Sequence, residues 1–466
     1  MQYVRPSSQV TSVQMNGHGP QGFLASAAPP GTADRATRTI AARKISFFMV
    51  SSPESGTILR LRRYYPAMLE PLFLALALTH VTVIDGTGAP AKPDQTVVVE
   101  GDRIAVVGKT GAVAVPKKAQ IVDASGKFLI PGLWDMHGHL TDAGESAFSQ
   151  LVMNGVVGVR DLGGDLQKVD RWRDEIRKGK RVGPDIVRAG PFVDGSKPGV
   201  TNRLTVLTPD EARAAVDSLE KKGVDFIKVH NGISKENFLA VAEEAKKQGL
   251  PLAVHLPIGM TPAEASDAGA ASLEHIETVV ESVIKRPGSA VKTMDEAFAE
   301  VAKEQDALFA KLVANKTWFD PTLIAYERGF VLWSNKPEAM VPRRSTAERQ
   351  LAIVTAMHKA GVRLLAGSDF SDWALVPGVD LHNELALLVE AGLTPLEALQ
   401  AATSGPAEFL GRRATQGTIE AGKRADLVLL DMDPLESISH TRKIRAVVLR
   451  GRWIPVAELR DRALRP

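Results

Sequence analysis

The chain has 466 residues, of which 24% are charged and 44% hydrophobic, and a formal net charge of +3. At roughly 100–200 residues per domain, this length predicts one large domain and a smaller one. The absence of cysteine excludes disulfides, thiolate metal sites and a cysteine nucleophile. The charge is spread without a long basic run, which argues against a nucleic-acid partner, and no apolar stretch reaches the ~18–20 residues of a membrane span.

Residues 1–70 show no sustained periodicity and are rich in Ser, Gly, Pro, Thr and Arg, which predicts a disordered extension or a targeting segment. The apolar run that follows, Leu72–Ala77, ends in the A-x-A form of a signal cleavage site. It lies far from Met1 and is preceded by an acidic residue and a proline, which favours a cytoplasmic protein. A true start near Met49 or Met68 would instead make this run part of the signal peptide of an exported or periplasmic protein.

Both ends of the remaining chain contain short alternating apolar runs, separated by Gly and Asp turns, that are typical of β-strands. On the N-terminal side, ALTHVTVIDGTG and QTVVVEGDRIAVVGKTG lie within residues 71–130. On the C-terminal side, ADLVLLDMDP and KIRAVVLRGRWIP lie within residues 411–466. We expect the two regions to form one small β-sandwich domain assembled from both chain ends.

Residues 131–410 alternate between strand and helix patterns. The strand candidates, in chain order, are GLWDMHGH, GVVGVRDLGG, PDIVRAG, DFIKVH, PLAVHL, ASLEHIE, WFDPTL and VRLLAGSD. Amphipathic helices lie between several of them, such as TPDEARAAVDSLEKKG, with Thr208 as N-cap and Pro209 at the first helical position. This α/β pattern predicts a (β/α)8 TIM-like barrel, whose active site lies at the C-terminal ends of the strands.

The first of these strands, within KFLIPGLWDMHGHL, ends in a His-x-His motif. Side chains on a strand alternate between two faces, so His137 and His139 point to the same side. Two imidazoles at the end of a buried strand are well placed to hold a metal ion. For an isolated motif, a pair of hydrogen-bonded surface histidines is the alternative.

Polar side chains recur at the ends of later strands. Lys228 ends the fourth strand, His255 the fifth, His275 the sixth and Asp369 the eighth. Taken singly, each has a structural explanation, as a salt-bridge partner, a hydrogen-bonded core histidine or a helix cap. Their joint occurrence at one rim of a barrel favours a shared site.

These motifs, in this order, resemble those of the amidohydrolase superfamily, in the branch of imidazolonepropionase-like and prolidase-like binuclear metal-dependent hydrolases. The resemblance rests on PGLWDMHGHL, GVVGVRDLGG, GVDFIKVH, AVHLP, SLEHIE, DPTL and LAGSDF, and on the later HNELALLVEAGLTPLEALQAATSGPAEFLG. It extends from around Leu76 to the C-terminus. It implies a hydrolase that acts on a carbon–nitrogen bond of a small-molecule amide.

The resemblance further implies a centre of two divalent metal ions. Its ligands would be His137, His139, Lys228, His255, His275 and Asp369. The Lys228 amine would carry CO2 as a carbamate, because an anionic bridge suits two dications and an ammonium does not. With histidine and oxygen ligands, Zn2+ is the expected metal, with Mn, Co or Fe as alternatives. A hydroxide bridging the ions would attack the amide, with Asp369 as the catalytic group that accepts and returns the proton.

Three further residues are candidate substrate contacts: His230, His382 and Tyr326. His230 lies two residues after Lys228 and so faces the same side, unless it is simply a polar loop residue. His382, expected in the loop after strand eight, resembles a histidine near the pocket of this branch, with a helix-cap role as the alternative. Tyr326 begins a segment, 326–340, that is expected to set specificity.

Arg160 and Asp161 lie at the second strand. We expect them to form an internal ion pair, with substrate binding as the alternative. Two positions depart from the family pattern. Phe370 follows the strand-eight aspartate where relatives often have Ser or Thr, and Pro257 stands where prolidase-like relatives carry a second histidine. Both changes alter the expected shape of the pocket and leave the metal ligands intact.

The predicted substrate is a dipeptide, an N-acyl amino acid or a related amide. One alternative keeps the enzyme class and changes the substrate to a cyclic amide resembling imidazolonepropionate. Another is a mononuclear deaminase. Such enzymes do not use a lysine at the end of the fourth strand, so Lys228 argues against this alternative. A non-catalytic binding barrel would have lost ligands, whereas this set is complete. Related barrels often form homo-oligomers, and the sequence leaves the oligomeric state open.

Overall fold

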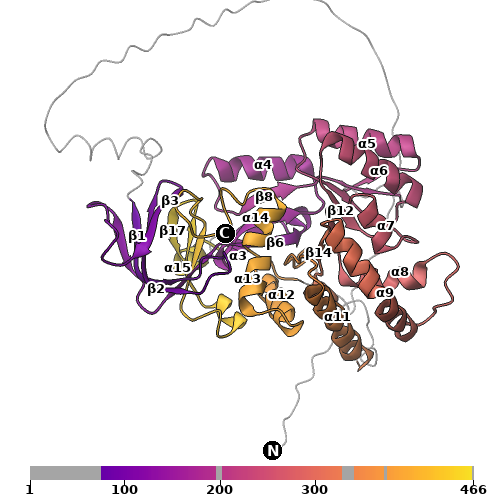
Figure 1. The fold of residues 1–466 in the computed structure, drawn as a ribbon. Helices are drawn as coiled ribbons and strands as arrows, with labels where there is room; N and C mark the ends of the chain where they lie inside the picture. Colours follow the sequence, from indigo (N-terminus) through magenta and orange to yellow (C-terminus); the bar gives the residue numbers. More distant parts are fainter. Residues whose placement is uncertain (1–74, 196–201, 328–340, 372–374, 464–466) are drawn as a thin grey trace, which may run out of the picture. The chain divides into compact units, whose positions relative to one another are not determined.

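The computed structural model describes residues 75–195, 202–327, 341–371 and 375–463. The predicted extension, residues 1–70, lies outside these ranges. The strands of the described chain form three sheets, and helices cover the parallel ones (Figure 1). In the described ranges, no helix combines the length and the apolar character that crossing a bilayer requires.

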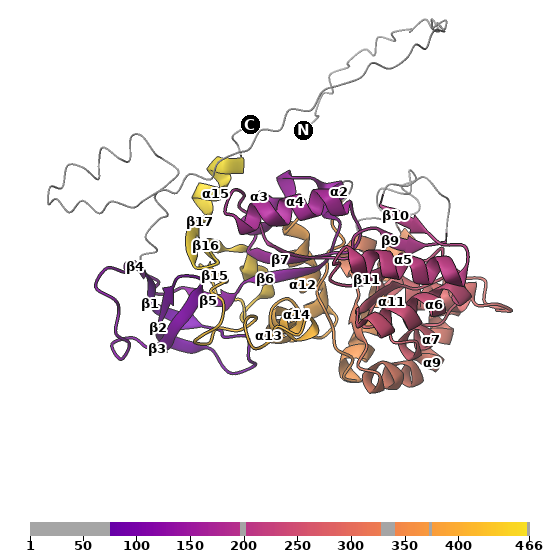
Figure 2. The same cartoon turned by 90° about the horizontal axis from the view of Figure 1, so that it is seen from above.

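Strands from both chain ends pair in one sheet. Its members are β1 (Leu76–Val83), β2 (Lys92–Glu100), β3 (Arg103–Lys109), β4 (Gln120–Asp123), β5 (Phe128–Pro131), β15 (Leu427–Leu430), β16 (Ile444–Leu449) and β17 (Arg452–Pro455). Strand β5 joins the two ends, because it runs parallel to β1 and antiparallel to β15. Figure 2 shows the indigo and yellow strands side by side. The two end regions therefore pair in one eight-stranded sheet, and the division of that sheet into the two layers of a sandwich stays a prediction.

Strand β1 changes its pairing partner along its length, and side chains of this sheet form a hydrophobic cluster of their own. Its first residues pair with β4 and its last with β5, and the register shifts between Leu78 and Val81. His80 lies at this shift with a φ of 58°, in the left-handed region. The strand also contains Leu76 and Ala77, the last residues of the candidate signal segment, both of them buried.

The middle of the chain forms two parallel sheets. One contains β6 (Leu133–Gly138), β7 (Val156–Asp161) and β8 (Asp185–Arg188), and the other β9 (Phe192–Asp194), β10 (Arg203–Thr205), β11 (Ile227–Val229), β12 (Leu252–His255), β13 (Ser272–Glu274) and β14 (Trp318–Asp320). Strands β6, β7, β11, β13 and β14 are buried along their whole length, as parallel strands covered on both faces are. Seven of the eight predicted barrel strands thus correspond to observed ones.

The eighth predicted strand is present only as isolated bridges between the two sheets. Leu365 donates its backbone N–H to Phe319 of β14 at 2.9 Å, and Met136 of β6 donates to Ala366 at 3.0 Å. Residues 363–370 therefore contact both sheets but do not form a regular strand. The positive φ of Asp369 (59°) breaks the extended backbone there.

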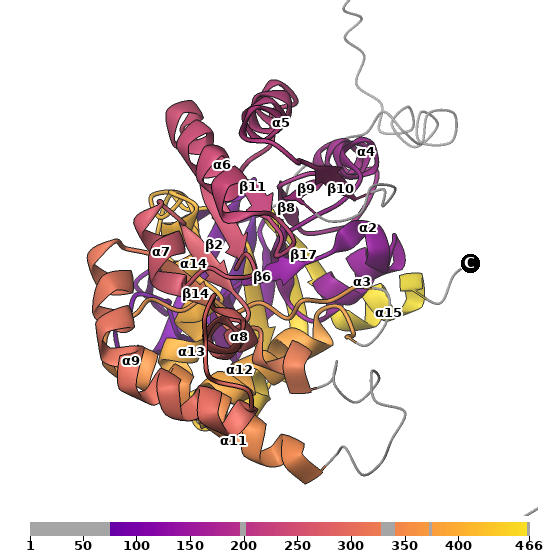
Figure 3. The same ribbon diagram turned by 90° about the vertical axis from the view of Figure 1, so that its right-hand side faces the viewer.

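Helices lie between the strands and around them. They are α2 (Leu140–Ala143), α3 (Ser146–Met153), α4 (Leu166–Arg177), α5 (Pro209–Lys221), α6 (Lys235–Gln248), α7 (Pro262–Asp267), α8 (Ile276–Lys285), α9 (Met294–Ala314), α11 (Val341–Lys359), α12 (Val379–Glu390), α13 (Pro395–Ala401), α14 (Ser404–Phe409), η2 (Ile438–Arg442) and α15 (Val456–Ala463). Figure 3 shows α4, α5, α6, α7, α9 and α11 outside the strands. The predicted start of α5 is confirmed, since Thr208 accepts from Glu211 N and Pro209 is the first helical residue.

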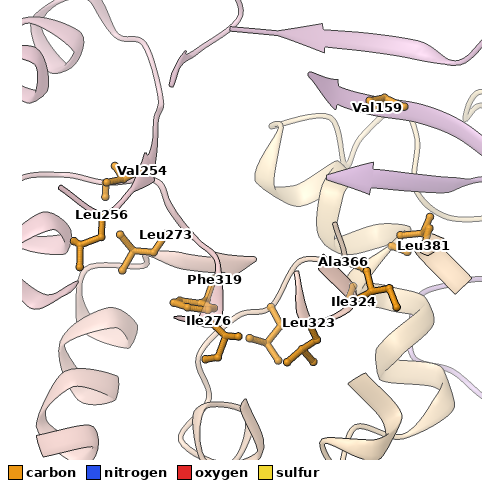
Figure 4. Close-up of a cluster of buried hydrophobic side chains, with 14 of the residues drawn as sticks. Val159, Val254, Leu256, Leu273, Ile276, Phe319, Leu323, Ile324, Ala366 and Leu381 are labelled. Atoms are coloured by element: carbon orange, nitrogen blue, oxygen red, sulfur yellow. The ribbon is translucent and has the colours of Figure 1, made fainter. Parts of the chain in front are cut away.

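The ends of the parallel strands rest on a tightly packed apolar core. Val254, Leu273 and Phe319, from three adjacent strands, are at most 2% exposed. Ile276 of α8 is fully buried in the same cluster (Figure 4). Because such cores are packed at crystal-like density, the strand ends above them have little freedom to move.

His382 belongs to this framework. It lies inside helix α12, not in a loop, and is 1% exposed. Its Nε2 donates to the Asn154 carbonyl at 3.0 Å, and its Nδ1 is 2.8 Å from the Thr441 hydroxyl of η2. Both ring nitrogens are engaged within the core, so the prediction of a substrate contact gives way to a structural role that links α12 to η2 and the end of α3.

Replacing His382 with leucine is expected to lower the free energy of unfolding by about 1–3 kcal/mol, because the Asn154 carbonyl and the Thr441 hydroxyl lose their partner. Urea unfolding measures this, and KM should stay unchanged. His358→Leu is the matched control, since that imidazole is 29% exposed and lies 3.6 Å from Glu397. A raised KM in His382→Leu with wild-type stability would restore the substrate-contact hypothesis.

The same residue predicts a pH dependence of stability. Burial lowers the pKa of His382 to about 4, below the 6.5 of an exposed histidine. The neutral ring therefore stabilises the fold above pH ~6.5, and this contribution is lost as the pH falls from 6.5 toward 4. We expect wild type to lose up to about 3 kcal/mol more than His382→Leu over this interval in urea unfolding. Parallel curves for the two proteins would contradict the assignment.

Candidate metal centre

Five histidines meet where the parallel strands end. His137 and His139 come from β6 and the residue after it, His255 ends β12, and His275 follows β13. The ring centroids of His137 and His275 are 4.5 Å apart, and those of His255 and His275 are 4.6 Å apart. His230 continues the row, 4.7 Å from His255. The structure thus gathers the histidines that the strand ends predicted.

Asp369 adds a carboxylate to this cluster. Its Oδ1 is 3.1 Å from His139 Nε2 and 3.5 Å from His137 Nε2. One ligand atom from each of the three residues lies within 4.8 Å of the others, which suits a single metal ion. Two imidazole nitrogens and a carboxylate oxygen are a donor set that Zn2+ and similar divalent ions accept.

In two of the histidines a side chain holds Nδ1 and leaves Nε2 to face a ligand. His137 Nδ1 is 3.1 Å from Glu274, and His275 Nδ1 is 2.9 Å from the Thr322 hydroxyl. His255 differs, because its Nε2 lies 3.1 Å from Asn231 Nδ2, a donor, and so acts as the acceptor. Fixing one ring nitrogen orients the imidazole and sets which nitrogen can bind a metal.

Lys228 lies among these groups without a hydrogen-bond partner in the described chain. Its side chain is 2% exposed and its Nζ is buried. Burial lowers the pKa of Lys228 to about 8, so about a tenth of the amine is neutral at pH 7, far more than for an exposed lysine. His137 Nε2 likewise has no hydrogen-bond partner among the described residues. Buried polar atoms without partners are rare, and here they fit a site that takes a metal ion.

Burial keeps His137, His255 and His275 in the neutral form that binds metals, whereas Asp369 outweighs burial at His139 and raises the pKa of that imidazole. Burial, together with the charge of Lys228, lowers the pKa of His137 to about 4. Burial and the neighbouring imidazoles lower the pKa of His275 well below its ordinary value. Burial opposes ionisation of Asp369, but His137 and His139 outweigh it and lower the pKa of that carboxyl to about 2. Neutral imidazoles beside an ionised carboxylate are ready ligands.

The backbone is strained at the site. His275, Thr322 and Asp369 have φ values of 71°, 45° and 59°, in the left-handed region that side chains with a Cβ avoid. Such strain persists only where the surroundings impose it, and it is concentrated at functional sites. Gly367 is required by a close approach, since a Cβ there would lie 2.5 Å from Asp320 Oδ2 and from His137 Cβ.

The predicted pair of Arg160 and Asp161 does not form. Consecutive side chains of β7 point to opposite faces, so Arg160 reaches Glu274 at 2.8 Å and Asp320 at 3.3 Å. Asp161 instead accepts the N–H of Leu140 at 2.8 Å. An internal ion pair exists at this strand, but its acidic partners come from β13 and β14.

The remaining candidates are His230, Tyr326 and the two positions that depart from the family pattern. His230 is 3.2 Å from Asp194 and its side chain is 31% exposed, so it stays a predicted substrate contact. Tyr326 is half-buried in the helical turn after β14, and its role also stays a prediction. Pro257 lines a narrow cleft together with His255, whereas Phe370 is buried, its ring packed against Gly138.

Sequence reasoning missed the residues behind the ligands. Asp135 accepts from the Ser368 N–H at 2.9 Å and hydroxyl at 2.6 Å, which fixes the turn that carries Asp369. Glu274 and Thr322 hold imidazoles. A signal for Glu274 was available, because Ser272 and Glu274 are polar residues two apart on a strand that is otherwise apolar.

Comparison with known proteins agrees with this site. Residues 128–454 match the model of the Amidohydrolase family. Ochratoxinase of Aspergillus niger is 26% identical over 431 residues, covering 78% of this chain and 83% of that protein. Imidazolonepropionase of Geobacillus is 24% identical over 404 residues, covering 78% of this chain and 92% of the relative. The crystal structure of a putative prolidase from Bifidobacterium longum superposes with a TM-score of 0.67 at 26% identity, covering 85% of this chain and 100% of that one.

The family model spans more than half of the chain, and the motifs that carry the resemblance all lie within or beside it. The neighbouring folds also agree with parallel strands covered by helices. The chain therefore belongs to the Amidohydrolase family and is a metal-dependent hydrolase of carbon–nitrogen bonds.

Proposed function

We propose that this chain hydrolyses the amide bond of a dipeptide, an N-acyl amino acid or a related small amide at a binuclear centre. The observation that carries the proposal is the convergence of His137, His139, His275 and Asp369 around the buried Lys228 amine, which has no hydrogen-bond partner in the described chain. The residues that would complete a (β/α)8 barrel, 363–370, contribute Asp369 between the two parallel sheets.

In this proposal, His137 and His139 would hold one ion together with Asp369, and His255 and His275 would hold the second. The short distances from Asp369 to both histidines of the first group support this division. Zn2+ is the ion best matched to imidazole and carboxylate donors. When bound, the two ions would activate a water molecule and polarise the scissile carbonyl.

The carbamate on Lys228 is the second part of the proposal. The neutral amine would attack CO2, forming an N–C bond and releasing a proton, and the resulting anion would offer two oxygens. Burial, the lowered pKa and the absence of a hydrogen-bond partner support this step, because a neutral, unpaired amine is the reactive form. An ammonium in the same place would repel two dications.

Asp369 is the proposed proton carrier. With a pKa of about 2 it is a carboxylate at neutral pH and can accept the proton of the attacking water. It can then deliver this proton to the leaving nitrogen, so that the C–N bond breaks with release of a neutral amine. The strained backbone holds this carboxylate toward the histidines.

The choice of substrate rests on relatives. The putative prolidase and ochratoxinase support an open amide, and imidazolonepropionase supports a cyclic amide as the second candidate. Lys228 argues against a mononuclear deaminase. This ranking of open before cyclic amides can be tested with the metal-loaded enzyme. It is incubated with panels of dipeptides, N-acyl amino acids and cyclic amides, and the products are identified by mass spectrometry. Cleavage of cyclic amides alone would favour the second candidate.

Asp369→Asn is expected to lower kcat on any substrate found by about 10²–10⁴-fold, because the amide cannot accept the proton. Steady-state kinetics measure the loss, and circular dichroism checks the fold. Asp210→Asn, at a carboxylate that is 98% exposed on α5, is the matched control and should keep wild-type activity. Wild-type kcat in Asp369→Asn would contradict the assigned role.

A further inference from the structure

A second group of potential ligands lies directly beneath the proposed metal centre. His137, Glu274 and Asp320 each offer a ligand atom within 4.8 Å of the others, and all three are fully buried. By spacing alone this group could hold an ion. It shares His137 with the outer group of His139 and Asp369, so the two groups would compete for the same imidazole.

Arg160 occupies the place of a cation in this inner group. Its Nη2 donates to Glu274 Oε2 at 2.8 Å and to Asp320 Oδ2 at 3.3 Å. Its Nε donates to the Met136 carbonyl at 2.6 Å and its Nη1 to the Ser272 hydroxyl at 2.8 Å. A guanidinium is charged at every relevant pH, and like charges at such distances repel by several kcal/mol, on the order of 4 for unit charges.

Glu274 connects this arginine to the outer centre. Its Oε2 accepts from Arg160 and lies 3.1 Å from His137 Nδ1. Through Oε1 it also accepts from the Ser272 hydroxyl. A carboxylate fixed by these three residues holds the proton on Nδ1 of the imidazole, and Nε2 is then the nitrogen that faces Asp369.

We propose that Glu274 and Arg160 are positioning residues that act through His137. Arg160 keeps the inner group free of metal and locks Glu274, and Glu274 directs the Nε2 lone pair of His137 to the outer group. The inference rests on the proposed role of His137 as a ligand. Buried ion pairs contribute little net stability. The proposal gives this pair a second function, which is to orient a metal ligand.

Glu274→Gln tests the proposal, because it keeps the shape of the side chain and removes the charge that fixes His137. Zn2+ affinity is measured on the full chain by competition with a chromophoric chelator. Losing such a partner is expected to weaken binding by about 10–100-fold. In the Co2+-loaded protein, the visible absorption bands should shift, which a purely structural role would not cause.

Glu244→Gln is the matched control. It makes the same exchange at a carboxylate that is 5% exposed on α6 and accepts from Lys247 and Gln248. Its Zn2+ affinity and Co2+ spectrum should remain those of wild type. Equal loss of affinity in the two variants, or none in Glu274→Gln, would overturn the proposal. Wild type that binds no metal would overturn the proposed function as well.

If Glu274→Gln does not fold, a measurement on wild type still tests the proposal. Histidine labelled with 15N reports which ring nitrogen carries the proton, and His137→Asn identifies the signal. The proposal predicts that His137 in the metal-free protein carries its proton on Nδ1. A proton on Nε2 would overturn it, because that nitrogen could not then bind an ion.

Discussion

The structure depends on the balance of charge in one buried space at the ends of the parallel strands. Imidazoles, an amine and carboxylates have lost water there, so each requires a partner. Asp369 and Glu274 supply part of what is needed, yet His137 Nε2 and Lys228 Nζ still have no hydrogen-bond partner among the described residues. A metal centre with a carbamate would complete this balance. The same buried charges therefore determine both how the strand ends pack and how the active site is formed.

Two layers of polar groups provide the partners that these buried charges require. The outer layer consists of histidines and Asp369, and the inner layer is organised by Arg160, whose donors reach β6, β13 and β14. The period of two along β6 places Asp135 beneath His137, so one strand serves both layers. The inner layer contains the permanently charged Arg160 with its hydrogen-bonded partners, whereas in the outer layer His137 Nε2 and Lys228 Nζ have no hydrogen-bond partner among the described residues. This difference separates the part that holds the fold from the part that performs chemistry.

The sequence predicted which polar residues gather at the strand ends, but not which residues hold them in place. Strand periodicity placed His137 beside His139, and the joint occurrence of polar strand ends identified Lys228 and Asp369. Periodicity failed at His275, which follows the inward-facing Glu274 and yet lies against His137, because its φ of 71° interrupts the alternation of the strand. The ion pair of Arg160 and the single end sheet depend on contacts between distant segments, which local patterns do not contain.

Metal content per chain tests the central claim most directly. Elemental analysis is made on wild type and Lys228→Ala, each prepared with and without bicarbonate. The carbamate-bridged centre predicts about two divalent ions per chain for wild type with bicarbonate, and fewer for Lys228→Ala under both conditions. About one ion per chain, unchanged by bicarbonate or by the loss of Lys228, would contradict the bridged centre and favour a mononuclear enzyme.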